Sequence, residues 1–226
     1  MFAKAEQEFR KARDKRDELF AKFGRLHADA DHGNYRSVKA ELERDLAMPL
    51  VQRDPELKIE ALSVLGTIDL NIDTNAAGAV WKEVLNTAIA SHDLKWENRA
   101  RGELGIFAGL SGNIGAAGAA LFKAIATAER LGDIGGAVNF MVWLANGMAL
   151  NGMADGALRE LDNATELARA NGYHQLPFEL SIARLRAIAM LPEPLRLKRI
   201  REAKRLLRPR CGLPSWRKSS ARELIS

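Results

Sequence analysis

The chain has 226 residues, of which 47% are apolar, and a formal net charge of +5. This apolar content suffices for a packed core and excludes wholesale disorder. The single cysteine, Cys211, excludes an intrachain disulfide. No run approaches the about 18 apolar residues of a membrane span, and residues 1–28 lack the apolar centre of a secretory leader. We therefore expect a cytoplasmic protein.

The composition favours an all-α fold. Ala, Leu, Glu, Lys and Arg dominate, and no stretch alternates between apolar and polar residues as a strand would. Turn-forming residues divide the chain into segments of roughly 14–20 residues, in which apolar positions lie three and four apart. Asp54 before Pro55 and Asn113 before the next segment are typical helix starts. The expected breaks fall at 29–34, 53–55, 71–75, 91–93, 111–115, 131–136, 151–155, 171–177 and 192–194.

Residues 1–28 form the first predicted element, a charged N-terminal helix. Its apolar positions follow steps of three and four, a heptad-like seam that one basic residue interrupts. This helix could mediate self-association into a homo-oligomer, or it could cap the first repeat. The seam consists of Phe2, Ala5, Phe9, Ala12, Arg16, Leu19, Phe23 and Leu26.

A repeat of about forty residues follows, which we place at 29–191. Small residues recur in alternate segments, where a bulky side chain would hold two crossing helices apart. Each pair of helices needs its neighbours to bury its apolar face, so the pairs should stack. The landmarks are Leu65-Gly66, Leu104-Gly105 and Leu144-Ala145, spaced 39 and 40 residues apart; Gly112 and Gly152; and Val84, Ala124 and Ala164, spaced 40 and 40.

These landmarks resemble the tetratricopeptide repeat family in its longer, about forty-residue variety. Residues 119–133 (AALFKAIATAERLGD) carry the closest likeness, an Ala-rich second helix that ends in Gly-Asp. The resemblance implies a right-handed α-solenoid of antiparallel helical hairpins. It also implies that the first helix of each pair lines a concave inner face that binds a protein or peptide.

Counting along those first helices gives a predicted binding stripe, because spacings of three and four place residues on one side of a helix. Asn139 and Asn146 can each donate to and accept from a peptide backbone. Arg99 and Arg186 could hold a carboxylate or a phosphate. The predicted partner-binding residues are Arg99, Ile106, Asn139, Val142, Asn146 and Arg186.

The C-terminus carries the positive charge. Residues 195–210 contain eight lysines and arginines and one glutamate, whereas residues 1–194 have a net charge of −4. We predict a basic capping helix at 192–210, since a solenoid needs a polar terminal helix, and a flexible tail at 211–226. The same charge would also suit nucleic acid.

Catalytic signatures are missing from the sequence, and the four histidines are scattered. We predict no enzyme activity, no cofactor and no metal site. The prediction is a non-catalytic scaffold that binds a protein or peptide. Two alternatives stay open, a ligand- or peptide-sensing module of a larger signalling or transcription system, and a nucleic-acid-associated protein that uses the basic C-terminus.

Overall fold

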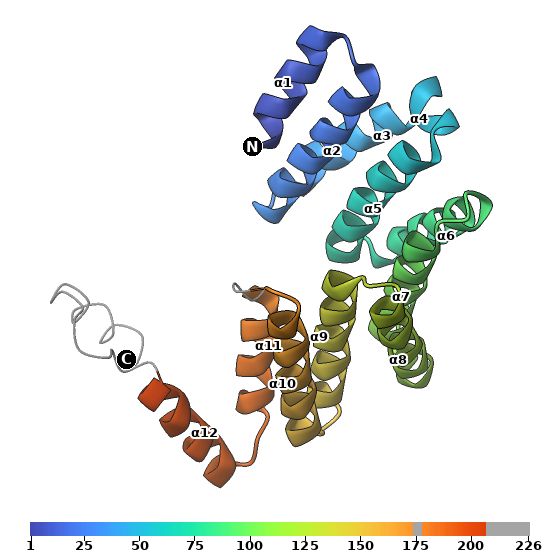
Figure 1. The fold of residues 1–226 in the computed structure, drawn as a ribbon. Coiled ribbons are helices and arrows are strands. Elements are labelled where there is room, and N and C mark those ends of the chain that lie inside the picture. Colours follow the sequence, from blue (N-terminus) through green and yellow to red (C-terminus); the bar gives the residue numbers. More distant parts are fainter. Residues whose placement is uncertain (174–177, 207–226) are drawn as a thin grey trace, which may run out of the picture.

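The computed structural model describes residues 1–173 and 178–206, and all regular structure in these residues is α-helical (Figure 1). The all-α prediction is therefore confirmed for the described part of the chain. The helices are α1 Phe2–Ala12, α2 Lys15–Asp31, α3 Tyr35–Leu46, α4 Pro49–Arg53, α5 Pro55–Ile72, α6 Thr74–Ala90, α7 Leu94–Leu110, α8 Ile114–Arg130, α9 Ile134–Leu150, α10 Ala154–Ala170, α11 Phe178–Ala189 and α12 Glu193–Leu206.

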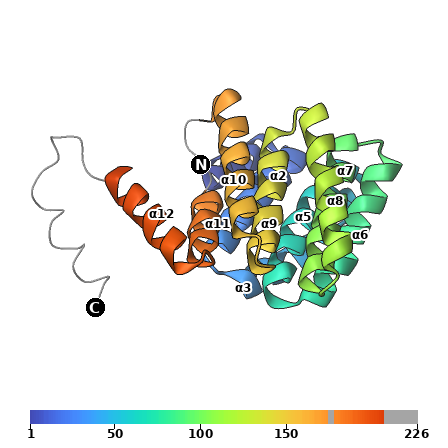
Figure 2. The ribbon, with the colours of Figure 1, turned by 90° about the horizontal axis from the view of Figure 1, so that it is seen from below.

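Successive helices pack as neighbouring pairs. The closest pairs are α5 with α6, α7 with α8, and α9 with α10, and each pair also contacts the next one through α6 with α7 and α8 with α9. The chain curves so that α2, α5, α9 and α11 lie along its inner side, and Figure 2 shows the pairs side by side from another direction. Helix α12 contacts α11 and extends away from the other helices (Figure 1).

The central helices α6 to α10 are more regular than the forty-residue landmarks indicate. Each has 17 residues and each starts 20 residues after the one before. Every turn contains one residue with positive φ, where glycine avoids the strain that a Cβ would cause. Four of these residues are glycines and one is His92 at φ 57°. They are His92, Gly112, Gly132, Gly152 and Gly172, each 20 residues apart.

Local hydrogen bonds explain these boundaries. At each turn a backbone N–H reaches back five residues, as from Asp133 to the carbonyl of Ala128 at 2.8 Å, and closes the preceding helix. The same Asp133 then accepts a hydrogen bond from the N–H of Gly136 at the start of α9. Side-chain caps of this kind start α6 to α9, whereas Met153 before α10 provides none.

The small landmark residues do lie where helices approach closely. A Cβ on Gly105 would lie 2.7 Å from the Cβ of Ala120 in α8, and one on Gly66 would meet the indole of Trp81 at 2.7 Å. At the third landmark, Ala145 is 1% exposed. The prediction that these positions permit close helix crossing is confirmed.

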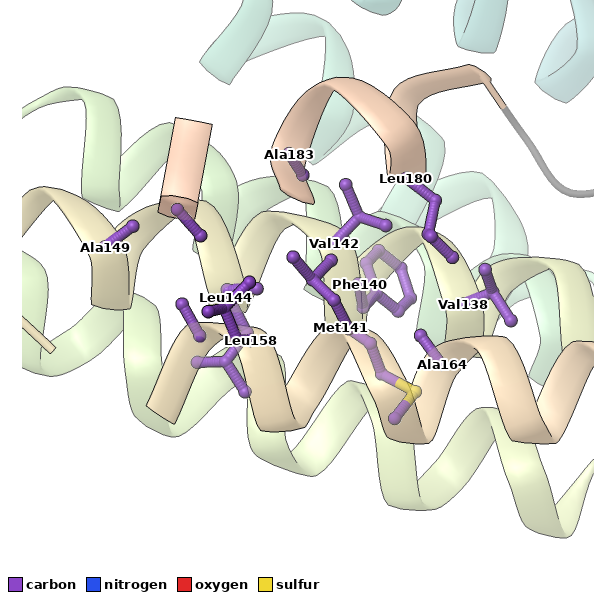
Figure 3. Close-up of a cluster of buried hydrophobic side chains, with 14 of the residues drawn as sticks. Val138, Phe140, Met141, Val142, Leu144, Ala149, Leu158, Ala164, Leu180 and Ala183 are labelled. Atoms are coloured by element: carbon purple, nitrogen blue, oxygen red, sulfur yellow. The ribbon is translucent and has the colours of Figure 1, made fainter. Parts of the chain in front are cut away.

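Among the described residues, the largest cluster of buried hydrophobic side chains lies mostly on α9, α10 and α11. Figure 3 shows Met141 and Leu144 of α9 directed toward α10, where Ala164 and Leu158 lie. Phe140 is 1% exposed, and a Cβ on Gly102 of α7 would come within 2.3 Å of its ring. The close approach of α7 to α9 therefore depends on a residue without a side chain.

The prediction of a single helix over residues 1–28 needs correction, because the structure has two helices there, α1 and α2. The chain breaks at Arg13, which has a φ of 61°, and Asp14 caps the new helix by accepting from the N–H of Asp17. The basic residue that interrupts the apolar seam, Arg16, forms ion pairs with Asp54, at 2.6 Å, and with Glu56. Helix α2 accordingly packs against α5. The break before Pro49 was also missed, although proline at a first helical position is a recognised start signal.

Candidate functional site

The predicted binding stripe lies along α5, α7, α9 and α11. We call the side of α5, α7 and α9 that carries Glu60, Arg99, Glu103, Asn139 and Asn146 the inner face. Glu60 is half-buried on α5, and its electrostatic neighbours are Arg99 of α7 and His27 of α2. The inner face thus extends across several helices that lie far apart in the sequence.

An ion pair between α7 and the start of α9 dominates the inner face. The guanidinium of Arg99 donates two hydrogen bonds to Asp133, from Nε at 2.7 Å and from Nη2 at 2.6 Å. It also lies over the ring of Trp96, 5.2 Å from the centroid. The hydrogen bonds from Arg99 hold the pKa of Asp133 below its usual value. The two hydrogen bonds fix the guanidinium in place, so Arg99 already binds a carboxylate of this chain.

Two carboxyl groups near Arg99 differ from Asp133. Burial raises the pKa of Glu60, and it raises the pKa of Glu103 to about 7, although the charge of Arg99 opposes both shifts. Glu103 is half-buried by its accessible surface and makes no hydrogen bond or ion pair among the described residues. At neutral pH its carboxyl group is therefore partly protonated. It can donate a hydrogen bond to an acceptor or lose its proton beside a cation.

The six predicted residues fall into three groups. Asn139 and Arg186 are exposed, and Asn146 is half-buried. Arg99 is tied to Asp133. Ile106 and Val142 are 3% and 5% exposed and belong to the hydrophobic core between α7 and α11. Asn139, Asn146 and Arg186 thus remain accessible to a partner, whereas Arg99 is held in its ion pair and the two apolar members pack inward.

A groove lies on the opposite side of α7. Residues two apart on a helix point roughly to opposite sides, so Arg101 and Gly105 face away from Arg99 and Glu103. The groove has a volume of 760 Å³, and α6, α7 and α8 form its walls. Its lining includes three basic side chains and one acidic side chain. The lining residues are Leu85, Leu94, Glu97, Asn98, Arg101, Leu104, Gly105, Ala108, Ala116, Ala120, Lys123, Ala124, Thr127, Arg130 and Leu131.

Sequence reasoning missed Glu103, Asp133 and this groove. Glu103 lies four residues after Arg99, on the predicted stripe, and a count of one further helical turn could have found it. In the sequence pattern Asp133 ends an Ala-rich segment, and its pairing with Arg99, 34 residues away, has no local signal. A comparison of α7 with α9 at a step of forty residues shows small or polar residues in α7 where α9 is apolar, which is the signal for the groove.

Two further findings bear on the kind of site. In the part of the chain that the structure describes, no three His, Cys, Asp or Glu side chains gather as metal ligands would. Within the same residues, no helix combines the length and the apolar character needed to cross a membrane. No protein-family model matches this chain, and a search of curated proteins found no match.

Proposed function

We propose that this chain is a non-catalytic scaffold that binds a protein or peptide along the inner face of a right-handed, tetratricopeptide-like solenoid. The observation that carries the proposal is the pair of polar side chains, Asn139 and Asn146, on the inner face of α9. Asn139 and Asn146 lie two turns apart on α9, and neither side chain makes a hydrogen bond among the described residues. Two free amides at this spacing suit the donors and acceptors of a peptide backbone.

The charges on the inner face support a mixed polar partner. Arg99 and Asp133 neutralise each other, which leaves Glu60 and Glu103 as the inner-face carboxyl groups that form no ion pair with any described residue. Each has a raised pKa because burial disfavours its charge. A lysine or arginine of a bound peptide would favour the charged form of both groups and gain an ion pair in return.

The test compares the wild type with an Asn139→Ala/Asn146→Ala variant in affinity capture from a nuclease-treated lysate, followed by mass spectrometry. We expect a protein that the wild type retains and the variant loses. The control is Asn75→Ala/Asn86→Ala, which removes two exposed amides from α6 and should retain the partner. Equal recovery by all three proteins would contradict the assignment of the inner face.

The position of α12 favours one alternative, association with nucleic acid. Its described side chains include Arg196, Lys198 and Arg201, and α12 extends away from the other helices (Figure 1). Phosphate binding through such a helix would weaken steeply as salt concentration rises. Removal of residues 195–226 would then abolish retention of single-stranded RNA or DNA. Retention unaffected by this truncation would rule the alternative out.

A further inference from the structure

The groove on the outer side of α7 differs from the equivalent place on α9. Helices α7 and α9 have the same length and lie 40 residues apart in register. Asn98, Arg101 and Ala108 of α7 correspond to Val138, Met141 and Met148 of α9. The α9 residues pack in the core, where Val138 is 4% and Met141 is 5% exposed. Large apolar side chains thus fill the space in one pair and are missing from the other.

The second helix of the pair also has smaller residues beside the groove. Ala120 and Thr127 of α8 correspond to Glu160 and Leu167 of α10, and Leu167 packs against the α9–α11 core. Asn98 is 5% exposed, and its side chain donates a hydrogen bond to the carbonyl of Ala124 at 2.9 Å. This hydrogen bond joins α7 to α8 through two residues that line the groove. The groove is therefore built into the fold and does not result from loose packing.

The charge around the groove differs from that of the surrounding chain. Arg101 forms an ion pair with Glu97 at 2.8 Å. The exposed side chains of Lys123 and Arg130 have no acidic partner among the described residues, and Arg130 donates only to the hydroxyl of Thr127. The lining side chains, three basic and one acidic, carry a local excess of positive charge within residues 1–194, whose net charge is −4. They complement a negatively charged partner with apolar side chains.

We propose that the groove between α6, α7 and α8 docks an acidic peptide segment of a partner protein, with its apolar side chains on the groove floor and its carboxylates on Lys123 and Arg130. The lining contains no aromatic side chain on which a nucleic acid base could stack, which favours a peptide. A volume of 760 Å³ holds several side chains of such a segment. This surface is separate from the inner face, so either proposal can fail without the other.

Fluorescence anisotropy tests the proposal with a labelled peptide of about three helical turns, with leucines three and four apart and glutamates elsewhere. We expect binding that weakens as salt is added, since exposed ion pairs are screened. Lys123→Glu/Arg130→Glu should weaken it about tenfold. The charge-matched control, Arg36→Glu/Arg169→Glu, changes exposed residues outside the groove and should bind like the wild type.

A second variant separates docking from folding. Ala108→Met/Thr127→Leu installs the residues found at the equivalent positions of α9 and α10, and we expect it to lose peptide binding while it keeps the wild-type melting temperature. Three results would overturn the proposal: no binding of the acidic peptide, equal binding of a peptide with lysines in place of its glutamates, or binding that the filled groove retains. Binding of a single-stranded oligonucleotide that Lys123→Glu/Arg130→Glu removes, with none of the peptide, would assign the groove to nucleic acid instead.

Discussion

Helix pairs α7–α8 and α9–α10 share one backbone plan and differ in what they bury. All four helices have 17 residues, and each is followed by a turn that contains a positive-φ glycine. Helix α9 contains no charged residue and has nine buried positions, whereas α7 contains five charged residues and has five buried positions. Turn and cap residues therefore set the repeat, and the residues between them decide how many positions of each helix are buried.

The largest predicted effect comes from the core of the second pair. Phe140→Ala should lower the free energy of unfolding by about 3–5 kcal/mol, because it removes a ring that fills the space against Gly102 and leaves a cavity. Urea denaturation followed by circular dichroism measures this loss. Phe122 on α8 is 61% exposed, so Phe122→Ala is the matched control and should change stability by less than about 0.5 kcal/mol. Equal losses would contradict the difference between the two pairs.

A smaller effect tests the inner face of the first pair. Burial raises the pKa of Glu103 to about 7, so the folded state favours the protonated carboxyl group. Its contribution to stability is therefore greatest at acidic pH and is lost as the pH rises from the unfolded value near 4.5 through 7. Glu103→Gln should raise the free energy of unfolding by about 1–2 kcal/mol at alkaline pH, because it removes a charge that burial disfavours. The gain is limited because part of the side chain remains exposed, and it should be smaller near pH 5.

The matching measurement is urea denaturation of both proteins across this pH range. Glu166→Gln, which changes an exposed carboxyl group of α10, is the control and should shift stability little at any pH. A Glu103→Gln gain that does not depend on pH would mean that the effect comes from packing and not from titration.

The smallest predicted effect concerns the one central helix without a side-chain cap. Met153 precedes α10 at the position that Asp93, Asn113 and Asp133 occupy before α7, α8 and α9. Met153→Asp should raise the melting temperature, with a gain of about 0.5–1 kcal/mol, because the new carboxylate can accept a backbone N–H of the first turn. Differential scanning calorimetry of Met153→Asp and Met153→Ala separates capping from the loss of methionine. No gain over the alanine variant would show that the cap geometry is not reached.

Helix positions were largely predictable because their signals are local. Asp54 and Asn113 cap the helices that they were expected to start, and the glycines after α8 and α10 lie at the predicted ends. The break at Arg13 was missed because arginine is not a typical residue for a positive φ, and the heptad-like seam continued through it. His92 hid the twenty-residue step in the same way, since it stands where the later turns have glycine.

The sequence by itself predicted the helical fold of the described residues, the repeat length and the small residues at the helix crossings. These features follow from caps, turns and helical periodicity, which act over a few residues. Tertiary structure alone decided that Arg99 is held by Asp133, that Ile106 and Val142 pack inward, and that partial burial raises the pKa of Glu103. It also decided that a groove of 760 Å³ opens beside α7, whereas the pocket lined by Met148 of α9 has a volume of 350 Å³. Accessible surface, pKa and ion pairing depend on neighbours that only the packing of distant helices brings together.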